Sequence, residues 1–118
     1  MNLKNAQASW NNLADTDPLW AILQVPVKKG RLWKRAEFFA TGKTEIDGVM
    51  EKINQLKFKL VYEKALDFGC GVGRMTQHLA HYFREVYGVD ISAGMIGLAK
   101  KYNKQGARCH YLVNGIPD

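Results

Sequence analysis

Residues 65–74 are Ala65-Leu66-Asp67-Phe68-Gly69-Cys70-Gly71-Val72-Gly73-Arg74, an apolar run that leads into three closely spaced glycines. The next apolar run ends in Val89-Asp90. A strand, a glycine-rich turn, a helix and a second strand that ends in an acidic residue form a βαβ unit of the kind that holds an adenosine-containing ligand. Glycine suits the turn because it has no Cβ, so it tolerates positive φ and lets the backbone lie directly against a ligand.

Two residues distinguish this turn from the turn of dinucleotide-binding enzymes. Those enzymes need Gly-x-Gly-x-x-Gly, and here Arg74 stands at the position of the third glycine. Asp67 stands two residues before the first glycine, where a dehydrogenase usually has an apolar residue. A carboxylate there repels a pyrophosphate at the helix N-terminus but attracts a ligand that carries an ammonium and a sulfonium. The pattern therefore favours S-adenosylmethionine and argues against an oxidoreductase.

Both segments resemble the cofactor motifs of the class I S-adenosylmethionine-dependent methyltransferases. Residues 67–73 are similar to the first motif of that family, and residues 88–95, where a strand ends in an acidic residue before a helix start, are similar to the second. Together with the N-terminal residues 10–42, these motifs make the sequence resemble most the small-molecule methyltransferases of the type 11 kind. The resemblance implies S-adenosylmethionine as the cofactor and a small molecule as the methyl acceptor.

The resemblance also implies a set of cofactor-binding residues. The turn backbone lies beside the methionine part of the cofactor, the carboxylate before the turn steers its ammonium, and Asp90 accepts hydrogen bonds from both ribose hydroxyls. Asn114 falls near the adenine amino group, at a position where an aspartate is more common in the family. The predicted cofactor-binding residues are Asp67, Gly69, Cys70, Gly71, Asp90, Ile91, Met95 and Asn114.

Each of these assignments has a purely structural alternative. The glycines could simply make a tight turn between a strand and a helix, and Asp90 could simply end a strand. Met95 has helical spacing with Leu98, Ala99 and Tyr102, a pattern that also fits packing in the core. Cys70 lies where the turn needs a small residue, so we do not expect it to act as a nucleophile. The sequence identifies no catalytic residue, because methyl transfer from a sulfonium depends mainly on positioning.

Along the chain, residues 1–56 are predicted to form an N-terminal helical extension and residues 57–118 a partial S-adenosylmethionine-binding Rossmann-like domain. Asp17 and Pro18 predict a helix start, with a side-chain acceptor at the cap and proline at the first position. Apolar residues at steps of three and four predict a helix over 43–55 whose stripe packs on the sheet: Ile46, Val49, Met50, Ile53 and Leu56. The other predicted elements are a helix over 34–41 that ends at Gly42, strands over 64–68, 85–89 and 108–113, a helix over 74–83 with Gln77 facing outward, and a helix over 92–103 that Ser92 caps.

The fold class predicted from this order is α/β: N-terminal helices followed by the first half of a Rossmann-like methyltransferase fold. Right-handed crossovers place its three parallel strands in the order 3-2-1. Because a full domain of this class has about seven strands, the 118 residues are interpreted as a truncated domain that is inactive by itself. The first strand then lies at an exposed edge, which favours self-association through that edge.

The net charge and the cysteines indicate which partners and which compartment to expect. The net charge of +6 is densest over residues 28–35, which we interpret as a solvated loop with Trp33 turned into the core, so nucleic acid is not an expected partner. Two isolated cysteines fit a reducing cytoplasm, and no apolar run has the length of a membrane span.

His78 and His81 have metal-ligand spacing but lack a third ligand, so no metal is predicted. Four aromatic residues are candidates for a lid over the cofactor, with core packing as the alternative: Trp10, Trp20, Phe38 and Phe39.

The leading hypothesis is therefore the cofactor-binding part of an S-adenosylmethionine-dependent methyltransferase that acts on a small molecule. Two alternatives share its fold. One is a non-catalytic interaction module, and the other is an RNA methyltransferase that uses the basic cluster at residues 28–35.

Overall fold

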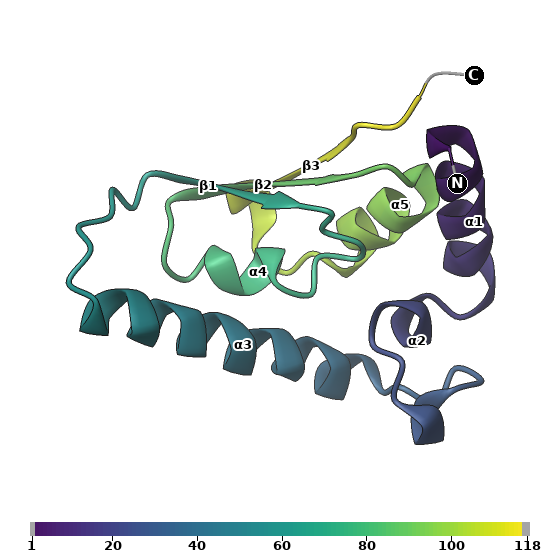
Figure 1. Cartoon of the computed structure of the whole chain (residues 1–118), viewed down its shortest axis with the longest axis horizontal. Helices are drawn as coiled ribbons and strands as arrows, with labels where there is room; N and C mark the ends of the chain where they lie inside the picture. The colour runs from purple at the N-terminus through teal and green to yellow at the C-terminus, as the bar shows by residue number, and fades with distance from the viewer. Residues whose placement is uncertain (1, 117–118) are drawn as a thin grey trace.

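Figure 1 shows a small parallel sheet with helices packed against one of its faces. The computed structural model describes residues 2–116, and within them the sheet has three strands in the order β1-β2-β3. Both strand pairs are parallel. The predicted α/β fold and strand order are thereby confirmed. The elements are, in chain order, α1 (Leu3–Thr16), α2 (Pro18–Ile22), the 3-10 helix η1 (Pro26–Lys28), α3 (Arg35–Gln55), β1 (Lys64–Phe68), α4 (Thr76–Leu79), β2 (Glu85–Asp90), α5 (Ala93–Tyr102), η2 (Gly106–Arg108) and β3 (Cys109–Val113).

The covered face of the sheet forms a core. Asp67, Gly88 and Tyr111 pair across the three strands and all three are buried. Gly88 is needed there because a Cβ would come within 2.9 Å of the Tyr111 ring and 3.0 Å of the Cys70 sulfur. This core consists of Cys70, Ala80, Val86, Ile96, Ala99, Cys109 and Tyr111.

The opposite face of the sheet is open within residues 2–116. Strand alternation turns Leu66, Phe68 and Leu112 to this face, where they are 63%, 76% and 55% exposed. Parallel sheets are normally covered by helices on both faces because their strands are apolar on both. The described residues therefore make a partial fold with one bare apolar face.

The start of α2 is as predicted, but the role of its cap residue is not. The helix begins at Pro18, and no side-chain hydrogen bond from Asp17 caps it. Instead, Asp17 Oδ2 accepts hydrogen bonds from the backbone N–H groups of Gly30, at 2.8 Å, and Arg31, at 3.0 Å. Both of these residues have positive φ, so the turn directs two successive amides at one carboxylate.

The predicted break in α3 at Gly42 is wrong, because the helix runs without interruption from Arg35 to Gln55. Glycine occurs there for a different reason: a Cβ on Gly42 would collide with the carbonyl oxygen of Arg74. The apolar stripe packs less completely than predicted. Ile46 and Met50 are buried, whereas Val49 and Leu56 are exposed. Figure 1 shows α4 between α3 and the sheet, so α3 packs on α4 rather than directly on the strands.

The helix after the glycine-rich turn is shorter than predicted. It spans only Thr76–Leu79, and a series of turns follows. The prediction that Gln77 faces outward is also wrong, because the side chain is buried. Gln77 Nε2 donates to the Tyr102 carbonyl, and its Oε1 accepts from the Lys104 N–H, each at 3.0 Å. The Gln77 amide thereby forms hydrogen bonds with backbone groups at the end of α5. The local sequence does not reveal these partners.

A second apolar cluster joins the N-terminal helices to α5 and to the glycine-rich turn. Its buried members are Ala14, Ala21, Phe38, Val72 and Met95. Because this cluster contains residues from both predicted segments, residues 2–56 pack on the sheet domain as part of a continuous structure. The boundary between residues 56 and 57 stays a prediction about the organisation of the chain.

Candidate functional site

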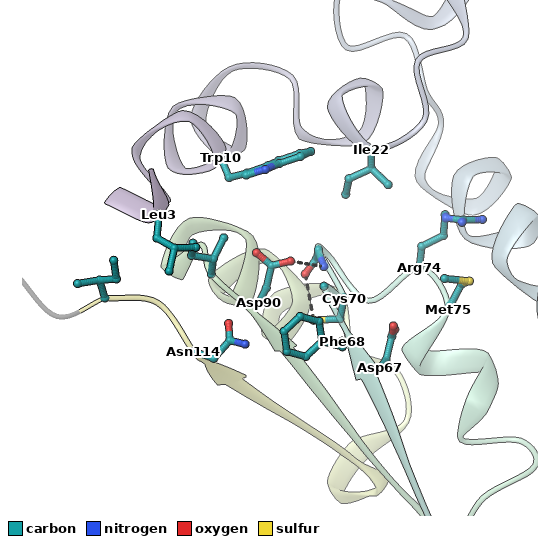
Figure 2. A pocket seen from close by; sticks show the side chains of 14 residues that line it. Leu3, Trp10, Ile22, Asp67, Phe68, Cys70, Arg74, Met75, Asp90 and Asn114 are labelled. Atoms are coloured by element: carbon teal, nitrogen blue, oxygen red, sulfur yellow. Dashed lines mark hydrogen bonds between the residues drawn. The ribbon is translucent and has the colours of Figure 1, made fainter. Parts of the chain in front are cut away.

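A cavity of about 580 Å³ opens at the carboxyl ends of the three strands. In Figure 2, Asp67, Asp90 and Asn114 lie at those strand ends, and Trp10 and Ile22 face them from the N-terminal helices. Ligands of open parallel sheets bind at this edge because the loops that follow the strands meet there. The lining residues are Leu3, Trp10, Ile22, Asp67, Phe68, Gly69, Cys70, Gly71, Arg74, Met75, Asp90, Ile91, Asn114 and Ile116.

The glycine-rich turn is held against the end of β2. The backbone N–H groups of Gly69 and Cys70 both donate to the Val89 carbonyl, at 2.8 and 2.9 Å. Gly69 and Gly73 have φ values of 76° and 85°, where a side chain would be strained. A Cβ on Gly73 would lie 2.7 Å from the Tyr111 hydroxyl, whereas a Cβ on Gly69 would meet nothing within 4 Å. Gly69 therefore leaves open space beside the turn, on the side of the pocket.

The Asp90 carboxylate is oriented by two backbone amides. Its Oδ2 accepts from the Gly71 N–H and its Oδ1 from the Ser92 N–H, each at 2.9 Å. Figure 2 shows this carboxylate beside the turn and facing the pocket. Each carboxylate oxygen has two lone-pair positions, so each can accept one further hydrogen bond. Asp90 is thus able to bind two hydroxyl groups of one ligand.

Asp67 is a second, more buried carboxylate at the pocket. It is 8% exposed, and its Oδ2 accepts a hydrogen bond from the Thr76 hydroxyl at 2.7 Å. Burial raises the pKa of Asp67 above its usual value, and the nearby Asp90 adds to this effect. The Thr76 hydrogen bond and the Arg74 charge oppose it. A positive charge on a ligand would lower this pKa and favour the ionised form, so the site is suited to a cation.

The structure brings seven of the eight predicted cofactor-binding residues to this pocket: Asp67, Gly69, Cys70, Gly71, Asp90, Ile91 and Asn114. Met95 is the exception. It is 1% exposed and packs with Phe38 and Ala14 in the second apolar cluster. Helix α5 turns this residue toward the N-terminal helices, so it does not line the pocket. The binding roles of all eight residues stay predictions.

Sequence reasoning missed several lining residues. Phe68, Arg74 and Met75 flank the glycine motif, so their place in the chain could have indicated them. Leu3, Ile22 and Ile116 come from distant segments and carry no local signal. Of the four aromatic lid candidates, Trp10 lines the pocket and the other three do not.

Arg74 connects the pocket to α3. Its guanidinium donates to the Thr41 hydroxyl at 3.2 Å and to Glu45 Oε2 at 2.6 Å. The side chain of Arg74 is therefore held by α3 rather than directed at the pocket as a free cation. This contact and the close approach at Gly42 place the N-terminal half of α3 directly against the glycine-rich turn.

Other kinds of chemistry find little support. Burial, together with Asp67 and Asp90, raises the pKa of the Cys70 thiol to about 12, so it stays protonated and is a poor nucleophile. The His78 Nε2 donates to the Phe39 carbonyl at 3.1 Å. Within residues 2–116, no three His, Cys, Asp or Glu side chains are grouped so that they could hold a metal ion. In that same range, no helix combines the length and the apolar character needed to cross a bilayer.

Comparison with known proteins gives a family match and a relative that each cover part of the chain. The sequence profile of the methyltransferase domain family matches residues 65–118. A protein described as "Probable S-adenosylmethionine-dependent methyltransferase CRG1" from Saccharomyces cerevisiae is 43% identical over 47 residues, which are 39% of this chain and 16% of that protein. The chain therefore spans only a small part of this relative.

Solved structures share the fold over nearly the whole chain. Magnesium protoporphyrin IX methyltransferase from Synechocystis PCC 6803 has a TM-score of 0.62 at 20% identity, covering 98% of this chain and 55% of that one. Phosphoethanolamine N-methyltransferase 1 from Haemonchus contortus has a TM-score of 0.61 at 18% identity, covering 97% and 22%. These likenesses show that the fold is shared, and the family match over residues 65–118 supports a class I S-adenosylmethionine-dependent methyltransferase-like domain there.

Proposed function

We propose that the pocket at the carboxyl ends of β1, β2 and β3 binds S-adenosylmethionine, and that the full-length protein transfers its methyl group to a small molecule. The geometry of Asp90 carries this proposal. Two backbone amides hold the carboxylate in place, and both of its oxygens keep the capacity to accept hydroxyl groups. The two hydroxyls of a ribose fit this arrangement.

The other residues of the pocket supply complementary groups for the rest of the cofactor. Gly69 leaves open space beside the turn for the methionine part. Asp67 would attract the ammonium of the cofactor, and because this carboxylate is buried, the low dielectric around it would strengthen the attraction. Ile91 and Asn114, which follow β2 and β3, offer an apolar contact and an amide to the adenine.

When bound, S-adenosylmethionine supplies an electrophilic methyl group. The residues of this chain then contribute by holding the cofactor in one orientation, since an in-line displacement is accelerated mainly by positioning. We assign no catalytic base among residues 2–116. Binding of S-adenosylmethionine without methyl transfer in the full-length protein would favour the alternative of a non-catalytic module.

A small acceptor is proposed rather than RNA. Two proteins that share the fold are named for phosphoethanolamine and magnesium protoporphyrin IX, although at this low identity they support the fold more than the substrate. The basic cluster offers little for a nucleic acid. Lys28 pairs with Glu37 at 3.0 Å, and the half-buried Trp33 donates its indole N–H to the Leu23 carbonyl at 3.0 Å.

A cytoplasmic location is also proposed, and the two free, buried cysteines support it. We further propose that residues 1–118 do not transfer methyl groups by themselves. The small share of the relatives that the chain spans supports this part of the proposal.

Calorimetric titration of the full-length protein with S-adenosylhomocysteine tests the cofactor site. We expect saturable binding, and a large loss of affinity in Asp90→Ala. Asp90→Asn should be nearly as damaging, because its NH2 group would face a backbone N–H instead of accepting from it. Asp15→Ala is the matched control, because Asp15 is exposed on α1 and does not line the pocket. Equal affinity in Asp90→Ala and the control would refute the assignment.

A further inference from the structure

Two side-chain amides of α1 attach this helix to segments distant in sequence. Gln7 pairs with the backbone of Ile116: its Oε1 accepts from the Ile116 N–H at 2.7 Å, and its Nε2 donates to the Ile116 carbonyl at 3.1 Å. Asn11 Oδ1 accepts from the Ser92 hydroxyl at 2.5 Å and from the Gly94 N–H at 3.1 Å. Because the two amides are four residues apart, they lie on one face of α1.

The segments that α1 packs against carry glycines at the points of closest approach. A Cβ on Gly94 would lie 2.9 Å from the Ala14 side chain, and a Cβ on Gly115 would lie 2.6 Å from Gln7 Oε1. Glycine at both positions thus lets the helix approach the start of α5 and the chain after β3. Without that approach, the hydrogen bonds of Gln7 and Asn11 could not form.

The contact at Asn11 continues to the cofactor-binding carboxylate. The Ser92 hydroxyl donates to Asn11, the Ser92 N–H donates to Asp90 Oδ1, and Asp90 Oδ2 accepts from the Gly71 N–H. One chain of hydrogen bonds therefore joins α1, the start of α5 and the glycine-rich turn.

The same helix covers the pocket. Leu3 and Trp10 line it, and Figure 2 shows Trp10 across the pocket from the strand ends. Neither Gln7 nor Asn11 is among the lining residues. Any effect of these two amides on a bound ligand must therefore pass through the placement of α1 and of Asp90.

We propose that Gln7 and Asn11 are positioning residues that hold α1 as a strap over the cofactor pocket, so that retention of the cofactor depends on two amides that do not touch it. The inference rests on the proposed S-adenosylmethionine site. The strap is the helix α1, and its two attachment points are Ile116 and the start of α5. Release of either attachment frees Leu3 and Trp10 from the pocket and opens a route for the ligand to leave.

The test compares single variants of the full-length protein. Gln7→Ala and Asn11→Ala each remove one attachment, and Asn12→Ala is the matched control. Asn12 is exposed on α1, and its backbone carbonyl, rather than its side chain, accepts a hydrogen bond from the Thr16 hydroxyl. Asn11→Asp is the conservative variant, because its carboxylate can still accept from both the Ser92 hydroxyl and the Gly94 N–H.

Three measurements separate positioning from simple loss of folded protein. Calorimetry with S-adenosylhomocysteine gives the dissociation constant and the stoichiometry, stopped-flow fluorescence gives the dissociation rate, and hydrogen exchange reports on the amides of residues 3–16. We expect Gln7→Ala and Asn11→Ala to raise the dissociation constant roughly tenfold, mostly through faster dissociation. Stoichiometry should stay unchanged, and exchange in residues 3–16 should speed up. Asn12→Ala and Asn11→Asp should stay close to the wild-type protein.

The outcomes distinguish this inference from the proposed function. If the wild-type protein does not bind S-adenosylhomocysteine, both are overturned. If it binds and the two attachment variants match Asn12→Ala in dissociation rate, the strap is refuted while the cofactor site stands. A fall in stoichiometry with an unchanged dissociation constant also refutes the strap, because it shows that the amides serve only to stabilise the fold.

Discussion

The carbonyl oxygen of Arg74 lies so close to Gly42 that no Cβ fits between them. Helix α3 thus crosses the end of the glycine-rich turn at a residue without a side chain. A larger residue at position 42 would push α3 and the glycine-rich turn apart. The contact explains why a glycine occurs inside an uninterrupted helix, where it costs about 1 kcal/mol relative to alanine.

Replacement of this glycine should destabilise the fold. We expect Gly42→Ala to lower the free energy of unfolding by roughly 1–3 kcal/mol, because the new methyl group forces α3 away from the turn. Gly48→Ala in the same helix is the control. A Cβ there would meet nothing within 4 Å, so the change should stabilise the protein by about 0.5–1 kcal/mol. Denaturant unfolding of both variants measures the difference, and similar stabilities would contradict the close contact.

A methyl group at Gly69 should obstruct the pocket. Gly69 and Gly106 have φ values of 76° and 60°, and a Cβ on either would meet nothing within 4 Å. Gly69→Ala and Gly106→Ala should therefore both lose roughly 1–2 kcal/mol of stability from backbone strain. Only Gly69 lines the pocket, so only Gly69→Ala should weaken binding of S-adenosylhomocysteine. Parallel titrations check this, and equal affinities would show that the cofactor does not approach the turn.

The buried carboxylate of Asp67 should make stability depend on pH. Because burial, as the largest effect, raises its pKa in the folded state, ionisation opposes folding. Its favourable contribution is fully present below its unfolded pKa of about 4 and is lost as the pH rises through the folded pKa. Asp67→Asn can keep the hydrogen bond from Thr76 and cannot ionise. The variant should therefore be more stable than the wild-type protein near neutral pH, with the difference vanishing in acid.

Thermal unfolding of both proteins from about pH 3 to about pH 7 measures this effect. At neutral pH the same variant should bind S-adenosylhomocysteine more weakly, because it lacks the negative charge that attracts the ammonium. Melting temperatures that differ by a constant amount across this range would argue against a raised pKa.

The 118-residue chain should self-associate through the edge of β1 and the bare face beside it. Leu66 is 63% exposed there, and an uncovered apolar strand at an edge favours pairing with a second chain. Leu66→Lys should reduce association, because a charge on the strand opposes burial. Val49→Lys, at an exposed position of α3, should leave association unchanged. Sedimentation velocity over a range of concentrations tests this, and a wild-type chain that remains monomeric at high concentration contradicts it.

Much of the fold could be predicted because its signals are local. The start of α5 is one example: Ser92 caps the helix by accepting from the Met95 N–H at 3.1 Å, as a serine before an apolar run indicates. The strands follow from short apolar runs between turn residues, and β1 has the bounds that were predicted. The placement of Asp67 and Asp90 at one pocket follows from parallel strands, whose carboxyl ends meet at the same edge.

The errors occur where a distant partner overrides a local preference. Gly42 is a helix terminator by sequence, but the close approach of Arg74 explains its presence inside α3. Gln77 is polar and was expected to face solvent, but backbone groups after α5 satisfy its amide in the interior.

The sequence by itself determined the glycine-rich turn, the acidic residue at the end of β2 and the order of the strands, because backbone sterics and chain connectivity act over a few residues. Only the tertiary structure decided that α1 lies over the pocket and that Gln7 and Asn11 attach it. Those two amides meet partners more than eighty positions away, and no local pattern encodes such a contact. A polar residue on a helix is compatible with solvent, with a cap or with a distant backbone, and packing of the whole chain selects among them.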